Sequence, residues 1–248
     1  MKTLVAIPVY NEHEHVAEVI EATRRFDCPI LAIDDGSTDG SAEILARQAD
    51  VAVITHPANL GYGQSVIDAF RYADAHGFDW VITMDCDEQH EPALIPAFLD
   101  AAERGDADII SGSRYLCADP ADDPPPPARR RINHTINARL ERVLGLRLTD
   151  SFCGFKAHRV AALRRLALSE PGYAFPMQFW VQCVCHGLRI REIPVPRIYR
   201  DARRSFGGAL DDPETRLQHY LRVFAQALAA LPPASIRGEP CCVMASCS

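Results

Sequence analysis

The chain has 248 residues, of which 48% are hydrophobic, a size and composition that suit one sizeable domain with a continuous core. Its formal net charge of −7 argues against a nucleic-acid-binding protein, so local basic clusters need local explanations. No apolar run approaches the ~20 residues that a membrane-spanning helix requires. The nine cysteines lack a metal-site spacing, and we expect no signal peptide, so most should be reduced thiols in a cytoplasmic protein.

The first half of the chain alternates short apolar runs with helical stretches. Strands are predicted, in chain order, at residues 4–9, 29–33, 51–55, 80–84 and 108–111. Helices are predicted between them at residues 14–25, 42–48, 65–75 and 92–103. This alternation predicts an α/β fold with a mostly parallel central sheet whose faces are covered by helices.

Acidic residues follow the ends of three of these predicted strands, at Glu12, at Asp34 and Asp35, and at Asp85 and Asp87. Ligands bind outside the carboxyl ends of parallel strands, so the acidic loops should meet at one edge of the sheet. Crowded carboxylates repel one another unless a cation lies between them, and Mg²⁺ and Mn²⁺ prefer oxygen ligands. One acidic turn alone would be explained as a solvated loop, but three converging turns favour a binding site.

The second half is less regular. A proline-rich segment at residues 119–127 predicts a surface loop. Further elements are predicted as helices at residues 128–144, 157–166 and 177–186 and as a strand at residues 189–195. Near the end, apolar residues at helical spacing predict an amphipathic helix that either docks on the domain or lies on a membrane surface. These residues are Leu217, Leu221, Phe224, Leu228 and Leu231. We therefore expect a single domain at residues 1–212, and this helix with a disordered tail at residues 213–248.

Four motifs occur in a fixed order along the first half: Pro8-Val-Tyr-Asn-Glu12, Asp34-Asp-Gly-Ser-Thr-Asp39, Asn59-Leu-Gly-Tyr-Gly63 and Asp85-Cys-Asp-Glu-Gln-His90. Together they resemble the inverting family-2 glycosyltransferases of the GT-A fold. The nearest subgroup is that of dolichyl-phosphate mannosyltransferases and polyprenyl-phosphate glycosyltransferases. Three later segments fit the same subgroup: Gly112-Ser-Arg114, Asp150-Ser-Phe-Cys-Gly-Phe-Lys156 and Glu192-Ile-Pro194. The resemblance spans about residues 4–207 and implies a Rossmann-like GT-A sheet in a single domain.

The resemblance implies transfer of a hexose from a nucleoside-diphosphate sugar, of the GDP-mannose or UDP-glucose type, to a polyprenyl or dolichyl phosphate. It also implies a divalent cation, Mg²⁺ or Mn²⁺, held by Asp85, Asp87 and Gln89. Such an ion would stabilise the charge that grows on the leaving diphosphate. By the same correspondence, the donor-binding residues are Pro8, Tyr10, Glu12, Ile33, Asp35, Asp85, Cys86 and Arg114.

The acceptor side carries the candidate cations. A lipid phosphate is already ionised and needs no general base, but it needs positive groups to hold its charge. The resemblance suggests Lys156, Arg200 and Arg203 for phosphate binding, and Arg114 as a residue that serves both substrates. The arginines at residues 129–131 either add to this patch or face anionic lipid headgroups. A hydroxyl acceptor would need a base, and Asp150 is the candidate. The candidate catalytic residues are therefore Asp87, Asp150 and Arg114.

One departure from the family pattern concerns a phosphate contact. Relatives commonly carry Arg-x-x-Gly-x-Ser-Lys where this chain has Arg200-Asp-Ala-Arg-Arg-Ser-Phe206, so Phe206 replaces the lysine. The contact is therefore either missing or supplied by another arginine, such as Arg203 or Arg204.

Several functional questions stay open from the sequence alone. The acceptor is either a lipid phosphate or a hydroxyl of a sugar, small molecule or protein, and a third alternative is a nucleotide-sugar-binding protein without turnover. The base and the sugar of the donor are not determined. A NAD-dependent dehydrogenase is excluded, because no Gly-x-Gly-x-x-Gly follows the first predicted strand. We expect a cytoplasmic protein, with peripheral association at the cytoplasmic membrane face as an alternative.

Overall fold

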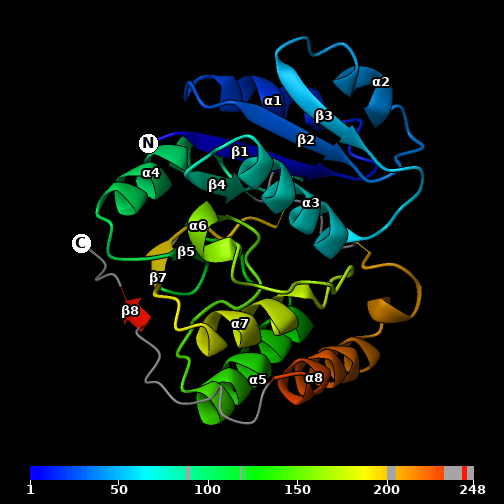
Figure 1. Cartoon of the computed structure of the whole chain (residues 1–248). Helices are drawn as coiled ribbons and strands as arrows, with labels where there is room; N and C mark the ends of the chain where they lie inside the picture. The colour runs from blue at the N-terminus through cyan, green and yellow to red at the C-terminus, as the bar shows by residue number, and fades with distance from the viewer. Residues whose placement is uncertain (88–89, 118, 120, 200–204, 232–241, 245–248) are drawn as a thin grey trace.

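A computed structural model describes residues 1–87, 90–117, 119, 121–199, 205–231 and 242–244. Among these residues, eight strands form one sheet in the order β3-β2-β1-β4-β6-β5-β7-β8 (Figure 1). The strands are β1 Thr3–Val9, β2 Ile30–Asp34, β3 Val51–Thr55, β4 Trp80–Thr83, β5 Ile109–Ser113, β6 Lys156–Arg159, β7 Ile190–Pro194 and β8 Cys242–Met244. Neighbouring strands are parallel except where β6 inserts antiparallel between β4 and β5. The predicted α/β fold with a mostly parallel sheet is confirmed.

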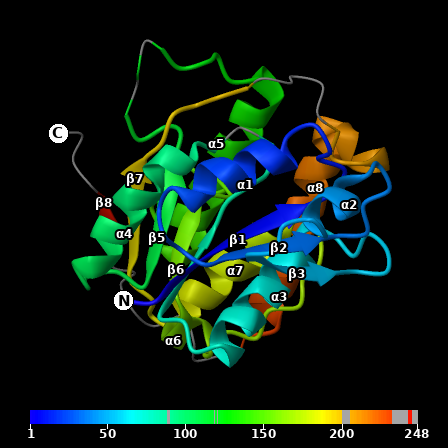
Figure 2. The ribbon, with the colours of Figure 1, turned by 90° about the horizontal axis from the view of Figure 1, so that it is seen from above.

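Helices cover both faces of this sheet. They are α1 Val16–Arg24, α2 Ser41–Leu45, α3 Tyr62–Ala75, η1 Pro92–Leu94, α4 Ile95–Glu103, α5 Pro127–Leu144, α6 Val160–Leu163, α7 Phe175–Cys185, η2 Gly208–Asp211 and α8 Pro213–Ala229. Side chains alternate between the faces along a strand, so Leu4 and Ala6 of β1 pack with α3 and α7, whereas Val5 and Ile7 pack with α1 and α4. Figure 2 shows the sheet and its flanking helices from above.

One secondary-structure prediction was wrong. Residues 157–166 were expected to form a helix, but residues 156–159 form β6 and only residues 160–163 are helical. The reason is long-range pairing, because β6 fills the space between β4 and β5 and joins two parallel groups of strands. Such tertiary context overrides local propensity.

The predicted amphipathic helix is α8, and it docks on the domain. Leu217 and Phe224 are buried, and the partly buried Leu221, Leu228 and Leu231 pack against the same apolar cluster. Figure 1 shows α8 beside α5 and α7. The apolar stripe is therefore covered by protein, while the domain boundary at residue 212 stays a prediction.

The C-terminal residues were predicted to be disordered. Of the tail, Cys242–Met244 instead pair with β7 as strand β8, which supplies hydrogen bonds to a strand edge. Within the described part of the chain, no helix has both the length and the apolar composition needed to cross a bilayer. Five cysteines, Cys28, Cys86, Cys153, Cys183 and Cys185, are free thiols, and Cys117 is disulfide-bonded.

Candidate functional site

The acidic strand ends meet at one cavity, as the sheet order requires. Because β1 is parallel to both β2 and β4, the loops that follow these strands lie at the same edge. Four carboxylates from these loops line the cavity: Glu12, Asp35, Asp85 and Asp87. Pro8, Tyr10 and Cys86 line it as well. Ile33 differs from the other predicted donor-binding residues, because its side chain is fully buried in the core.

Asp35 fixes the turn that follows β3. Its Oδ1 accepts hydrogen bonds from His56 Nδ1 at 2.7 Å and from the Leu60 backbone N–H at 2.8 Å, and its Oδ2 accepts one from the Gly61 N–H at 2.9 Å. A Cβ on Gly61 would lie 2.4 Å from the Pro171 carbonyl oxygen. The glycine is therefore required because the segment before α7 packs directly on this turn, and that segment carries pocket-lining residues.

Asp85 lies against a glycine from a distant segment. A Cβ on Gly154 would be only 2.5 Å from both carboxylate oxygens of Asp85. The Asp85 backbone N–H donates to Nδ1 of the buried His90 at 3.0 Å. His90, five positions along the chain, thus holds the main chain of Asp85. Gly154, from a much more distant segment, packs against its carboxylate.

The residues present fit a hard divalent cation that arrives together with a ligand. Asp85 and Asp87 offer carboxylate oxygens to the cavity. The predicted third ligand, Gln89, lies outside the described residues. Among those described, no group of three or more His, Cys, Asp or Glu side chains converges as a complete metal cage. Mg²⁺ is typically bound through one or two carboxylates, with phosphate oxygens and water completing its shell, so this donor set suits a diphosphate-bound ion.

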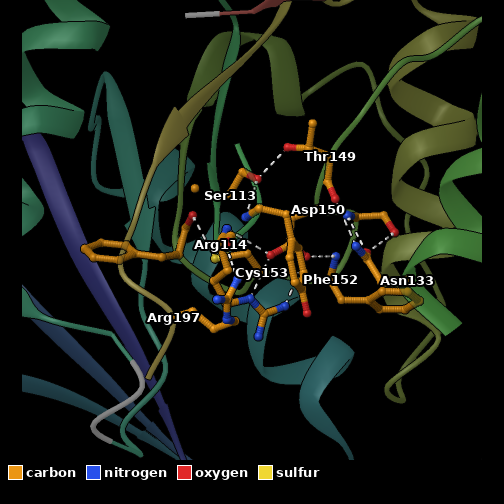
Figure 3. A network of polar contacts seen from close by, with 12 residues as sticks. Ser113, Arg114, Asn133, Thr149, Asp150, Phe152, Cys153 and Arg197 are labelled. Atoms are coloured by element: carbon orange, nitrogen blue, oxygen red, sulfur yellow. Dashed lines mark hydrogen bonds and ion pairs between the residues drawn. The ribbon is translucent and has the colours of Figure 1, made fainter. Parts of the chain in front are cut away.

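Arg114 and Asp150 form a buried ion pair beside the cavity (Figure 3). The Arg114 Nε donates to Asp150 Oδ2 at 2.7 Å and its Nη2 donates to Oδ1 at 3.0 Å. Asp150 is fully buried and also accepts from the backbone N–H groups of Arg114 and Phe152. Burial favours the neutral acid, but the charge and hydrogen bonds of Arg114 outweigh it and hold the pKa of Asp150 below its usual value.

A second buried carboxylate, that of Glu192, holds the backbone of the turn that carries Asp150. Glu192 of β7 accepts hydrogen bonds from the Thr149 N–H and hydroxyl and from the Asp150 N–H, all within 3.0 Å. On the other side, the amides of Asn133 and Asn137 donate to the Thr149 carbonyl oxygen. The turn that carries Asp150 is therefore held on both sides, and Asp150 in turn orients Arg114, which lines the cavity.

Asp150 and Lys156 are placed differently from what their predicted roles require. Neither is among the residues that line the main cavity. Lys156 is buried in β6, where its ammonium donates to the Cys153 carbonyl oxygen and lies 5.5 Å from the Trp180 ring. Burial lowers the pKa of Lys156. The other two predicted phosphate-binding residues, Arg200 and Arg203, lie outside the described residues.

Arginines and aromatic rings line much of the rest of the cavity, and we call this group the arginine wall. Its members are Arg114, Tyr115, Arg129, Phe152, Tyr173, Tyr199, Phe206, Arg216 and Tyr220. Arg114, Arg129 and Phe206 were named from the sequence, but the others were not. Arg216 was missed, although the pattern of α8 contained a signal. Arg216 precedes Tyr220 by one helical turn and so lies on the buried face of the helix, where an apolar residue is expected.

Comparisons with known proteins agree with this architecture. Residues 4–167, more than half of the chain, match the model of Glycosyl transferase family 2. The chain is 29% identical over 214 residues to the undecaprenyl-phosphate mannosyltransferase of Micrococcus luteus, covering 83% of this chain and 87% of that protein. It is 30% identical over 205 residues to the polyprenol monophosphomannose synthase of Mycolicibacterium smegmatis, covering 78% and 76%.

A solved structure shows the same fold. The crystal structure of glucosyl-3-phosphoglycerate synthase from Mycobacterium tuberculosis superposes with a TM-score of 0.69 at 18% identity, covering 94% of this chain and 82% of that one. The family match, the relatives and the shared fold agree with the acidic strand ends. This chain belongs to glycosyl transferase family 2.

Proposed function

We propose that this protein is an inverting enzyme that transfers a hexose from a nucleoside-diphosphate sugar to a polyprenyl phosphate. The observation that carries the proposal is the charge asymmetry of the cavity. Its four lining carboxylates come from the loops after β1, β2 and β4, whereas its lining arginines, Arg114, Arg129 and Arg216, come from the end of β5, from α5 and from α8. The carboxylates suit a metal-bound donor, and the arginines suit an anionic acceptor.

The donor nucleoside is assigned to the β1 and β2 end, beside Tyr10, Glu12 and Asp35. Its diphosphate is assigned to Asp85 and Asp87, which would hold the divalent cation. The bound ion supplies Lewis-acid stabilisation of the leaving diphosphate. A solved structure of glucosyl-3-phosphoglycerate synthase contains Mn²⁺ with uridine diphosphate and phosphoglyceric acid, which supports a metal-assisted donor site in this fold.

The acceptor assignment rests on the arginines of the cavity and on the state of Asp150, the candidate base. Both oxygens of Asp150 are engaged by Arg114, and Asp150 is not among the residues that line the cavity. A hydroxyl acceptor needs a group that removes its proton, but an ionised phosphate does not. One phosphate oxygen therefore attacks the anomeric carbon as the bond to the diphosphate breaks, with inversion. The names of the relatives from Micrococcus and Mycolicibacterium support this acceptor class. In this proposal Asp150 is a positioning residue for Arg114.

The experiment is a transfer assay with purified protein, Mg²⁺ or Mn²⁺, and GDP-mannose or UDP-glucose, each with and without farnesyl phosphate. We expect a glycosylated lipid phosphate that forms only with metal. Transfer to farnesol or to a sugar hydroxyl, but not to the phosphate, would replace the proposed acceptor class. Donor binding without any transfer or donor hydrolysis would indicate a nucleotide-sugar-binding protein.

A further inference from the structure

Arg216 is a buried cation for which the described residues provide no ion-pair partner. Its exposed fraction is 4%, and its neighbours on the inner face of α8, Leu217 and Tyr220, belong to the apolar core. Its Nη1 donates to the Leu210 carbonyl oxygen at 2.5 Å, and the Asp211 carbonyl oxygen lies at 3.5 Å. Carbonyl oxygens do not neutralise a buried guanidinium, and among the described residues no carboxylate forms an ion pair with it.

The nearby carboxylates, Asp211 and Asp212, accept their hydrogen bonds from other groups; these bonds, and to a smaller extent the charge of Arg216, lower the pKa of both. Asp211 accepts hydrogen bonds from the Ser205 hydroxyl and the Phe206 N–H, and Asp212 accepts from the N–H and hydroxyl of Thr215 as the cap of α8. Both acids lie on the exposed side of this turn. Arg216, in contrast, lines the cavity.

Phe206 holds two arginines at the cavity. The guanidinium carbon of Arg216 lies 4.0 Å from the centre of the Phe206 ring, and that of Arg129 lies 5.1 Å from the same ring. Stacking engages the face of a guanidinium and leaves its N–H edges for hydrogen bonds to phosphate oxygens. Tyr173 also contacts Phe206, edge-on, with the two ring centres 5.4 Å apart.

The position of Arg216 in the cavity indicates whether it contacts the donor or the acceptor. In the sheet, β5 and β7 are separated from β1 and β2 by β4 and β6, so the loops after β5 and β7 lie away from the nucleoside end. Arg216 contacts Phe206, which follows β7 in the chain, and lines the same cavity as Arg114, which follows β5. An anion at Arg216 would therefore lie beside the elements that supply the arginines of the cavity, which are not those that supply its four carboxylates.

We propose that Arg216 binds the phosphomonoester of the acceptor and supplies the cation that Phe206, in place of a lysine, does not. This inference rests on the proposed function, which makes the acceptor a phosphate. The apolar rings of Phe206 and Tyr173 then lie where the first carbon atoms esterified to that phosphate would pack.

The test compares Arg216→Gln with Arg222→Gln, a control on the exposed face of the same helix. Initial rates are measured over concentrations of donor, of farnesyl phosphate and of glycerol 3-phosphate. We expect Arg216→Gln to raise the KM for the phosphate acceptor about tenfold or more, because a charged hydrogen-bond partner is lost. The KM for the donor should stay within about twofold, and Arg222→Gln should match the wild type in both. An unchanged acceptor KM in a folded Arg216→Gln protein would overturn the inference.

A rescue separates binding from folding. Phe206→Lys in the Arg216→Gln background should lower the acceptor KM again, because the new ammonium would lie beside the lost guanidinium. No rescue, with the double variant folded, would count against a shared phosphate site. If Arg216→Gln does not fold, Arg216→Met replaces it, because an uncharged side chain of similar length suits this buried position, and an unchanged acceptor KM in that folded variant would reject the assignment.

The two acceptors distinguish failure of this inference from failure of the proposed function. Wild-type transfer to glycerol 3-phosphate but not to farnesyl phosphate would reject the lipid acceptor and leave Arg216 testable on the small phosphate. Wild-type transfer to neither phosphate, combined with transfer to a hydroxyl, would reject both proposals.

Discussion

Replacing Gly154 by alanine should disable the metal-binding end of the cavity without unfolding the protein. The added Cβ would lie 2.5 Å from both oxygens of Asp85 and 2.7 Å from its Cγ. Unstrained carbon–oxygen contacts are roughly 1 Å longer, so something must move by about that distance. Gly154 does not have a positive φ, so alanine is compatible with its backbone. The Asp85 carboxylate, which is partly exposed to the cavity, is the group that can move.

A displacement of about 1 Å at a catalytic group can cost about 100-fold in rate, which corresponds to about 2.7 kcal/mol of transition-state stabilisation. We therefore expect kcat/KM of Gly154→Ala to fall by about two orders of magnitude. Calorimetric titration of donor in Mn²⁺ should show weaker metal-dependent binding. The Tm should change little. Alanine lowers the conformational entropy of the unfolded chain, which stabilises the folded protein by about 0.4–1 kcal/mol and offsets part of the local strain.

Gly172→Ala is the matched control. At this glycine a Cβ would meet only the Glu170 Oε1, at 3.3 Å, and the φ is not positive either. We expect near-wild-type kinetics for it. If Gly154→Ala is folded and binds donor with the same metal dependence as the wild type, Asp85 does not need its present position and the metal assignment is refuted.

Three further predictions concern the carboxylates. Asp87→Ala should abolish metal-dependent donor binding with an unchanged Tm, whereas Asp74→Ala, at an exposed ion pair with Arg164, should bind normally. Persistent metal-dependent binding in Asp87→Ala would exclude its role. Asp150→Asn leaves Arg114 buried without its counterion, which should cost about 3–5 kcal/mol in the free energy of unfolding at pH 7. Because the pKa of Asp150 is lowered on folding, its stabilisation is present above its ordinary pKa of about 3.9 and is lost as pH falls below it. Unfolding measured from pH 7 to pH 3 should therefore show the wild type converging on the variant, and a constant gap would contradict the ionised pair. Glu192→Gln should lose about 1–3 kcal/mol, because an amide cannot replace all of its accepted hydrogen bonds. Glu141→Gln, at an exposed ion pair with Arg147, should keep the wild-type stability. Equal stabilities for the Glu192→Gln and Glu141→Gln proteins would show that Glu192 is not needed for the turn that carries Asp150.

The parallel part of the fold and the acidic end of the site could be predicted from the sequence because both depend on local order. A parallel strand that ends in an acid places that acid at the common edge whatever else the chain does. Glu12, Asp35, Asp85 and Asp87 all follow this rule, and all line the cavity.

The arginine side was predicted only in part: Arg114 and the arginines at residues 129–131 were named from the sequence, but the placement of the other residues depends on long-range pairing. Lys156 and Ala157 are neighbours in β6 but face opposite sides of the sheet, and only the pairing of β6 with β4 and β5 decides which side each takes. Lys156 consequently lies in the interior beside Trp180 and does not line the main cavity. Arg216 reaches the site only because α8 folds back onto α5 and α7, a contact that no local motif encodes.

The segment at residues 150–156 explains how the two ends of the cavity are kept in register. Asp150 at its start orients Arg114, on the proposed acceptor side, and Gly154 abuts Asp85, on the proposed metal side. Phe152, between them, lines the cavity itself. The segment then enters β6, whose antiparallel pairing with both β4 and β5 fixes it to the strands that precede Asp85 and Arg114. A transfer reaction needs donor and acceptor at a defined separation, and here one short segment bridging two strands determines it. If the proposed function holds, the antiparallel strand that interrupts an otherwise parallel sheet serves the site as well as the fold.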